Sequence, residues 1–154
     1  MTGLLIIAHA PLASALAHCA EHVYTCEPGM ARANVRALDV EPEAPPEELF
    51  ARAQALMKEV DAGAGVLVLT DAFGATPGNL ASRLNEPGRV AVVAGVNLPM
   101  LLRAVCYRGE SLADVAAKAL AGGQQGMMQV ASTAVQNQGY KPQGNDYQRL
   151  HHQQ

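Results

Sequence analysis

The chain lacks the features of a secreted or membrane-bound protein. Only three of its 154 residues are cysteines, and their odd number and irregular spacing do not make a disulfide framework. The first apolar run, residues 4–8, is short and has no basic residues before it, unlike a secretory signal. No run approaches the ~20 apolar residues that a membrane helix needs. We therefore expect a cytoplasmic protein with reduced thiols and no membrane insertion.

Charged residues are scarce, at 16% of the chain, and the formal net charge is only −3 at pH 7. Because lysine and arginine form no long run, nucleic acid and anionic membranes are poor candidates for partners. Neither G-x-G-x-x-G nor a P-loop follows the first apolar run, which counts against a nucleotide-binding or flavin-binding module. Small neutral or anionic ligands remain open.

What the chain has is a regular alternation of strand and helix patterns. Hydrophobic residues make up 49% of the sequence, enough for the core of one domain, and the length leaves no room for a second domain. Apolar or alternating runs predict strands at residues 3–8, 34–40, 66–70 and 90–94. Helices are expected after Pro11, over residues 47–60 and 77–84, and from the N-capping side chains Asn97 and Ser111.

This order of elements predicts the class of fold. An unbroken apolar strand such as residues 3–8 is typical of a parallel sheet covered on both faces. The repeated βα alternation therefore predicts an α/β fold with a mostly parallel, flavodoxin-like sheet and helices on both faces. Such sheets bind ligands at the carboxyl ends of their strands.

The end of the chain has a different composition. We expect Gly122 and Gly123 to end the last helix and residues 127–131 to form a short late strand. The domain would then span residues 1–135. Residues 136–154 are rich in glutamine, asparagine and glycine, and are expected to form a flexible polar tail.

Side-chain periodicity predicts which faces of the helices are buried. His18 and His22 fall on the solvent side of the first helix, so although they recur with Cys26 at intervals of four, we expect no metal site there. Cys106 falls on an apolar stripe and is expected in the core. The core-facing stripe of the first helix is predicted to consist of Leu12, Leu16, Cys19 and Val23.

Two ionisable side chains follow strands that are expected to be neighbours. His9 comes at the end of the first strand, and Asp71 directly follows the third. In a right-handed βαβ arrangement these strands are commonly adjacent, so the two side chains would emerge side by side at the carboxyl edge of the sheet. If Asp71 accepts a hydrogen bond from Nδ1–H, the lone pair of His9 Nε2 faces outward, as a nucleophile requires.

A turn follows Asp71 and leads into the next helix. It contains Gly74, Ala75 and Thr76, with Thr76 a good N-cap and Pro77 suited to the first helical position. Free backbone N–H groups at such a helix start bind phosphate oxygens, helped by the helix dipole. An oriented histidine beside an anion-binding turn predicts phosphoryl transfer through a phosphohistidine, which needs neither a metal nor a cofactor.

The same fold allows an alternative function. A receiver domain of two-component signalling would use Asp71 itself as the phosphoryl acceptor. Such a domain needs an acidic pair at the end of the first strand to hold magnesium, and this chain has His9 there instead. Magnesium-dependent self-phosphorylation from acetyl phosphate would support the receiver, whereas a label that is labile in acid and stable in base would indicate histidine.

Three stretches of the chain, "LLIIAHAPLASAL", "GVLVLTDAFGATPGNLASRL" and "VAVVAGVNLPMLLRAV", carry a further signal. They resemble the mannose-family IIA component of the bacterial phosphoenolpyruvate-dependent sugar phosphotransferase system (PTS), and the resemblance covers residues 3–122. It implies that His9 is phosphorylated on Nε2 by the phosphocarrier HPr, that Asp71 bonds to the histidine, and that Thr76 places a hydroxyl near the phosphoryl group. It also implies a homodimer in which the late strand, residues 127–131, joins the neighbouring subunit's sheet.

The resemblance also indicates which protein would receive the phosphoryl group from His9. Longer members of that family continue into a IIB domain, whereas this chain stops, so we expect a free-standing IIA that passes its phosphoryl group to a separate IIB component or serves as a regulatory sensor of phosphorylation. The sequence departs from the family pattern close to the expected site but leaves His9 and Asp71 intact. The departures are Ala8 where threonine is common, Ala10 where glycine is usual, and Ala72 where a polar residue follows the aspartate.

Overall fold

The computed structural model describes residues 1–24 and 35–130, and the strands in these ranges form one parallel sheet. They pair in the order β2-β1-β3-β4, and every pairing is parallel. The predicted α/β fold is therefore confirmed, with β1 and β3 as neighbours. The strands are β1 (Gly3–His9), β2 (Val35–Val40), β3 (Val66–Thr70) and β4 (Val90–Ala94).

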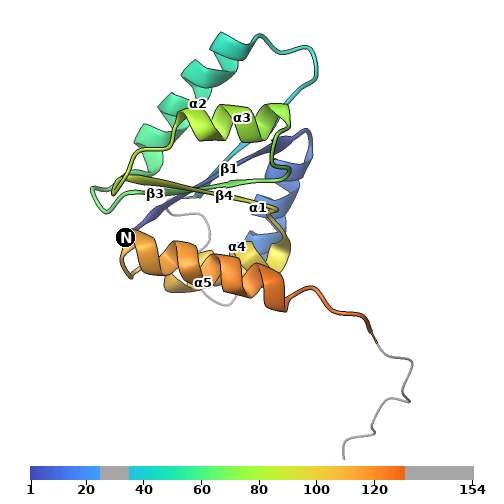
Figure 1. Cartoon of the computed structure of the whole chain (residues 1–154), viewed down its shortest axis with the longest axis vertical. Helices are drawn as coiled ribbons and strands as arrows, with labels where there is room; N and C mark the ends of the chain where they lie inside the picture. Colours follow the sequence, from blue (N-terminus) through green and yellow to red (C-terminus); the bar gives the residue numbers. More distant parts are fainter. Residues whose placement is uncertain (25–34, 131–154) are drawn as a thin grey trace, which may run out of the picture.

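Helices cover both faces of this sheet, as the alternating pattern predicts. Helices α2 and α3 lie on one face, and α1, α4 and α5 pack on the other (Figure 1). Each helix follows a strand in the chain except α5, which follows α4 and packs against it. The helices are α1 (Leu12–Val23), α2 (Pro46–Val60), α3 (Thr76–Arg83), α4 (Leu98–Tyr107) and α5 (Leu112–Gln125).

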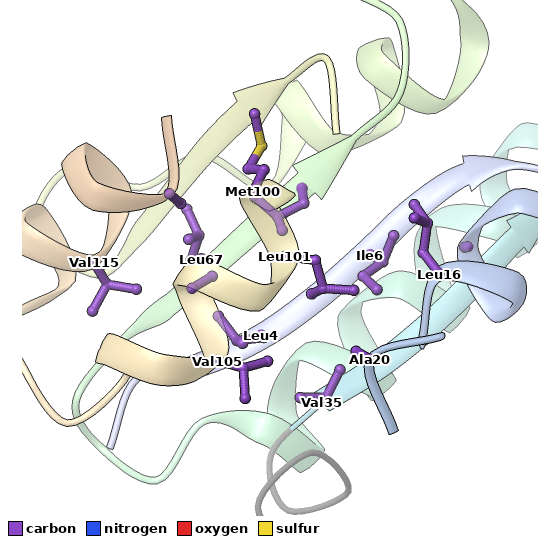
Figure 2. Close-up of a cluster of buried hydrophobic side chains, with 14 of the residues drawn as sticks. Leu4, Ile6, Leu16, Ala20, Val35, Leu67, Met100, Leu101, Val105 and Val115 are labelled. Atoms are coloured by element: carbon purple, nitrogen blue, oxygen red, sulfur yellow. The ribbon is translucent and has the colours of Figure 1, made fainter. Parts of the chain in front are cut away.

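Strand β1 runs through the middle of the core. Leu4 and Ile6 pack in the cluster beneath α1, α4 and α5 (Figure 2), whereas Leu5 and Ile7 pack in the cluster beneath α2 and α3. All four are 0% exposed, and burying each side chain contributes about 1.5–3 kcal/mol. Burial on both faces explains the unbroken apolar run. His9, the last residue of the strand, is the first to reach solvent.

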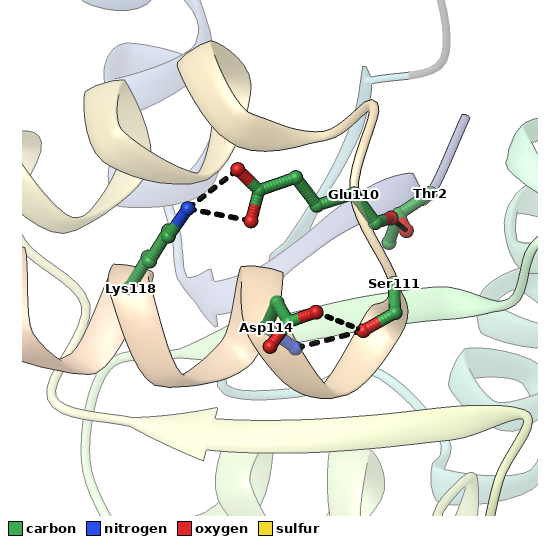
Figure 3. Close-up of polar contacts among 5 residues, drawn as sticks. All are labelled: Thr2, Glu110, Ser111, Asp114 and Lys118. Atoms are coloured by element: carbon green, nitrogen blue, oxygen red, sulfur yellow. Dashed lines mark hydrogen bonds and ion pairs between the residues drawn. The ribbon is translucent and has the colours of Figure 1, made fainter.

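Helices α4 and α5 begin at the predicted caps. The side-chain oxygen of Asn97 accepts a hydrogen bond from the Met100 amide at 2.9 Å. The Ser111 hydroxyl accepts one from the Asp114 amide at 3.2 Å and donates to the Asp114 carboxylate (Figure 3). Such caps satisfy amides that have no partner within the helix, at about 0.5–2 kcal/mol each.

The turn between α4 and α5 is fastened to the start of the chain. The Thr2 amide donates to the Arg108 carbonyl at 2.8 Å, and the Thr2 hydroxyl donates weakly to the Glu110 carbonyl. The Lys118 ammonium binds both carboxylate oxygens of Glu110 (Figure 3). These contacts lie at the amino end of the sheet, so they support the fold at the end away from His9.

The predicted core stripe of α1 is wrong in three of its four members, and only Leu16 is buried. Cys19 is exposed, and Leu12 and Val23 are 39% and 50% exposed. The buried stripe consists instead of Ala13, Leu16 and Ala20, because the small alanines let the helix lie close to the sheet. In an alanine-rich helix both stripes are apolar, so periodicity alone does not choose between them. Cys106 is exposed as well, contrary to its predicted place in the core.

The predicted end of the last helix is also wrong, because α5 continues through Gly122 and Gly123 to Gln125. Here glycine serves close packing. A Cβ atom on Gly122 would lie 2.8 Å from Arg103 Cβ, and one on Gly123 would lie 2.7 Å from Met100 Cε. The missing side chains therefore allow α5 to approach α4 closely.

The last predicted elements lie at the margin of the described residues. Residues 127–130 pair with none of the strands β1 to β4 that the structure describes. Ala131, the predicted tail at residues 136–154, and Cys26 lie outside the described residues. Pairing of the late segment with a second chain stays a prediction.

Thr70, at the end of β3, leads to a prediction about stability. Its residue is 1% exposed, and its Oγ1 is the one buried side-chain oxygen or nitrogen in residues 1–24 and 35–130 that has no hydrogen-bond partner. Thr70→Val removes this hydroxyl at similar volume and should raise the free energy of unfolding by about 1 kcal/mol, measured by urea denaturation. Thr70→Ser, the control, keeps the hydroxyl but leaves a methyl-sized cavity, and should lower it by about 1 kcal/mol. Destabilisation by valine would show that the hydroxyl has a partner.

Candidate functional site

The carboxyl edge of the sheet brings His9 and Asp71 together. In the register of β1 and β3, Ile7 lies beside Thr70, so Asp71 follows directly next to the end of β1. His9 Nδ1 lies 2.7 Å from Asp71 Oδ2, and the His9 amide donates to the same oxygen at 2.9 Å. One carboxylate oxygen therefore fixes both the backbone and the ring of the histidine.

Asp71 is held in its charged form. Its partial burial alone would raise the pKa, but hydrogen bonds from the His9 amide, the His9 ring and the Ala72 amide outweigh burial and lower the pKa below its usual value. Because the carboxylate only accepts, Nδ1 carries the proton of the bond. His9 Nε2 is then the nitrogen with the lone pair, and the side chain is 54% exposed.

The loop after His9 is fastened to β2. The Ala10 amide donates to the Val40 carbonyl at 3.1 Å, and the Ser14 amide in the first turn of α1 donates to Asp39 Oδ1 at 3.1 Å. Asp39 thus supplies the anion at the start of α1. The sequence did not predict this role for Asp39. The signal that could have suggested it is an acidic residue near the end of β2, the strand beside β1.

The start of α3 has no such side-chain anion. The helix begins at Thr76 with Ala75 in the capping position, and no side chain caps it. The predicted N-cap role of Thr76 is therefore wrong by one residue, and Pro77 occupies the second helical position. The amides of Gly74 and Thr76 and the Thr76 hydroxyl bond to no acceptor or donor within residues 1–24 and 35–130. These groups are the ones available for an anion.

Two glycines shape this turn. Gly74 has φ +82°, a left-handed conformation that favours glycine. Gly78 packs against the backbone of the turn, since a Cβ atom there would lie 2.5 Å from the Ala72 carbonyl oxygen. Sequence reasoning included Gly74 but missed Gly78, whose signal was a glycine in the first turn of a helix. The Asn79 side chain lies 3.5 Å from the Gly74 carbonyl and gives the turn a further, weak contact.

Other candidate residues lie away from this arrangement. His18 and His22 are exposed on α1, and the described residues contain no cluster of three His, Cys, Asp or Glu side chains that could hold a metal. Asp71, the acceptor in the receiver alternative, is occupied in orienting His9 and has a side chain only 13% exposed. None of the described helices combines the length and apolarity required to cross a bilayer.

The arrangement as a whole suits transfer of an anionic group to nitrogen. It has an exposed ring nitrogen with a lone pair, a carboxylate that can stabilise positive charge on the ring, and uncapped amides at the start of α3 on the same edge of the sheet.

Comparisons with known proteins point the same way. The EIIA-man family model, described as the PTS system fructose IIA component, matches residues 3–120. Over 106 residues the chain is 32% identical to the mannose-specific EIIAB component of the PTS from Escherichia coli K12. That alignment covers 67% of this chain and 33% of the relative, so the chain spans about a third of the length of the curated relatives it matches.

Solved structures share the fold over most of the chain. The PTS component EIIA from Streptococcus agalactiae has a TM-score of 0.70 at 25% identity, covering 84% of this chain and 97% of that one. The mannose/sorbose-specific IIA subunit from Enterococcus faecalis has a TM-score of 0.74 at 24% identity, covering 87% and 98%. Because the family model matches residues 3–120, which are most of this chain, the chain belongs to the EIIA-man family of PTS IIA components.

Proposed function

We propose that the chain carries a phosphoryl group on His9 Nε2, received from the phosphocarrier HPr. The observation that carries this proposal is the 2.7 Å hydrogen bond between His9 Nδ1 and Asp71 on a ring that is 54% exposed. It leaves Nε2 unprotonated and accessible. Membership of the EIIA-man family supports a phosphoryl-transfer role in the sugar PTS.

The transfer is a displacement at phosphorus. The lone pair of His9 Nε2 forms the new bond to phosphorus, while the bond from phosphorus to the donor breaks and its electron pair stays with the donor. The imidazole gains positive charge in this step, and the Asp71 carboxylate stabilises that charge through Nδ1–H. The amides of Gly74 and Thr76, with the Thr76 hydroxyl, would bind the phosphoryl oxygens.

From His9 the phosphoryl group would pass to a IIB component. The E. coli relative is named an EIIAB component and is about three times as long as the stretch it shares with this chain, which supports a IIB protein as the acceptor. Alternatively, the phosphorylated state itself would be the output, and the chain would act as a regulatory sensor. Following label from the phosphorylated protein into candidate IIB proteins of the same cell distinguishes these roles.

The proposal is tested by incubating the protein with phosphoenolpyruvate, enzyme I and HPr. We expect a stoichiometric gain of one phosphoryl group, measured by intact mass, that is lost in acid and kept in base. Omitting HPr should prevent it. A label that instead forms from acetyl phosphate with magnesium, and is lost in base, would favour the receiver alternative at Asp71.

We also propose that the protein is a homodimer in which residues 127–131 of each chain pair with the sheet of the other. Within residues 1–24 and 35–130, the only strand that pairs with β4 is β3; the opposite edge has no pairing but the bridge between Val90 and Glu86, and four of the five residues of β4 are partly exposed. The segment after α5 carries three strongly exposed hydrophobic residues, Met127 (68%), Met128 (75%) and Val130 (88%). An open strand edge and an unpaired apolar segment support exchange between two chains.

Val130→Lys should therefore weaken the dimer. Burying a valine contributes about 1.5–3 kcal/mol, so its loss in both copies should raise the dimer dissociation constant by roughly 100-fold or more, measured by sedimentation. Val23→Lys, on the exposed side of α1, is the matched control and should leave the constant unchanged. Equal sedimentation of wild type and Val130→Lys over a dilution series would contradict the exchange.

A further inference from the structure

The loop between β4 and α4 holds Asp71 on the side away from His9, because β3 lies between β1 and β4 in the sheet. The Gly95 amide donates to the Asp71 carbonyl at 3.0 Å, and the Val96 amide donates to the Thr70 carbonyl at 2.9 Å. Gly95 has φ +86°, a left-handed conformation that favours glycine. Asp71 is therefore held from two directions, through its side chain by His9 and through its backbone by this loop.

The loop ends at Asn97, whose side chain joins two helices. Its Oδ1 accepts a hydrogen bond from the Met100 amide at 2.9 Å, at the start of α4. Its Nδ2 donates to the Gly123 carbonyl at 3.2 Å, in the last turn of α5. The last four carbonyls of a helix have no partner within the helix. Asn97 therefore caps the start of α4 with its oxygen and the end of α5 with its nitrogen.

The bond between Asn97 and α5 depends on close packing. A Cβ atom on Gly123 would lie 2.7 Å from Met100 Cε and 3.5 Å from Asn97 Nδ2. The missing side chain at Gly123 thus lets its carbonyl approach the Asn97 amide. Val96, the residue before Asn97, packs against the core cluster beneath α4 and α5. The loop is therefore fastened to both helices as well as to β3.

Asparagine supplies both of the groups that this position uses. Serine and aspartate cap a helix start about as well as asparagine does. However, a serine hydroxyl does not extend as far as the amide nitrogen, and a carboxylate only accepts. Neither side chain can bind the Gly123 carbonyl while it caps α4.

We infer that Asn97 is a positioning residue for phosphoryl transfer to His9 and acts through Asp71. From the Gly123 carbonyl the contacts run through Asn97 and the loop to the Asp71 backbone. The Asp71 carboxylate then fixes the ring of His9. Without the bond to α5 the loop is held by α4 alone, so the carboxylate binds His9 Nδ1 less firmly and orients the ring in fewer molecules. The inference rests on the proposed function, because it concerns the rate at which His9 takes up the phosphoryl group.

Two variants keep the cap of α4 and remove the bond to α5. Asn97→Ser loses the donor, and Asn97→Asp places a negative oxygen against the Gly123 carbonyl. Ser111→Ala is the matched control, because it removes a helix cap of the same kind, the bond from the Asp114 amide, at the other end of the sheet from Asp71. Thermal unfolding checks that each variant is folded.

Labelling is measured with two donors, phospho-HPr and phosphoramidate, a small compound that loses ammonia as its P–N bond breaks. With either donor the rate should fall by about 10-fold in Asn97→Ser and further in Asn97→Asp, because a small misplacement of an orienting group has an effect of this size. The KM for phospho-HPr should stay within about two-fold of wild type, since the change affects the chemical step.

The tautomer of His9 gives a second readout that a loss of stability would not change. Nitrogen NMR should show the ring proton fixed on Nδ1 in the wild type and divided between the two nitrogens in both Asn97 variants. Ser111→Ala should match the wild type in labelling rate and in tautomer.

The inference is overturned by an unchanged rate in both Asn97 variants, by slower labelling with the tautomer of the wild type, or by an equal loss of rate in Ser111→Ala. Slower labelling by phospho-HPr alone would also overturn it, because Asn97 would then act on the contact with the donor. A wild type that takes label from neither donor would refute the proposed function instead, and the tautomer comparison would then decide by itself whether Asn97 positions Asp71.

Discussion

Replacing His9 with alanine should abolish labelling by phosphoenolpyruvate, enzyme I and HPr, a fall in rate of at least ~10³-fold. The substitution removes Nε2, the atom that is proposed to bond to phosphorus. The fold should persist, because the side chain is 54% exposed and leaves the buried part of β1 untouched. Intact mass after the reaction measures the label, and thermal unfolding measures the fold.

His18→Ala and His22→Ala are the matched controls for this variant. Both histidines are exposed on α1, in the element that follows His9, and neither is paired with a carboxylate in the described residues. They should take up label at the wild-type rate. Label retained in His9→Ala would contradict the assignment, and its position, found by peptide mapping, would name the true acceptor.

Much of the fold could be predicted because the strands of a parallel sheet have a distinctive apolar sequence pattern. The apolar runs at residues 66–70 and 90–94 match β3 and β4 at both ends. Strands buried on both faces need unbroken apolar runs, and polar or glycine residues end them. The pairing of His9 with Asp71 followed from topology alone, since adjacent parallel strands place the residues after them at one edge.

The details that were wrong depend on how helices pack. The rotation of α1 is decided by which side chains fit the sheet, and Ala13 and Ala20 fit more closely than Leu12 and Cys19. Glycine at residues 122 and 123 has two uses, to end a helix or to let two helices approach, and only the position of α4 reveals the second. The role of Asp39 likewise depends on a contact between β2 and α1, so the acidic residue near the end of β2 suggests that role only once the position of α1 is known.

Asp71→Asn should slow labelling of His9 by about 10²–10³-fold without unfolding the domain. The asparagine keeps an oxygen near the His9 amide but loses the charge that stabilises the imidazole when phosphorus bonds to Nε2. Because hydrogen bonds hold the pKa of Asp71 below its usual value, the wild-type carboxylate is ionised throughout the neutral range. The difference in rate between the two proteins should therefore persist across that range. Rates are measured with both phospho-HPr and phosphoramidate.

The role of Asp71 in orienting the His9 ring can be measured separately from its effect on the rate, through the tautomer of the ring. In the wild type the carboxylate fixes the proton on Nδ1, and nitrogen NMR of His9 should report that tautomer. In Asp71→Asn the proton should divide between the two ring nitrogens, so the fraction with a lone pair on Nε2 falls together with the rate. Asp61→Asn is the matched control, because Asp61 is also a hydrogen-bonded carboxylate but contacts Gly63 and Arg89 instead of His9. A slower rate with an unchanged tautomer would show that Asp71 acts through charge alone, and an unchanged rate would remove it from the site.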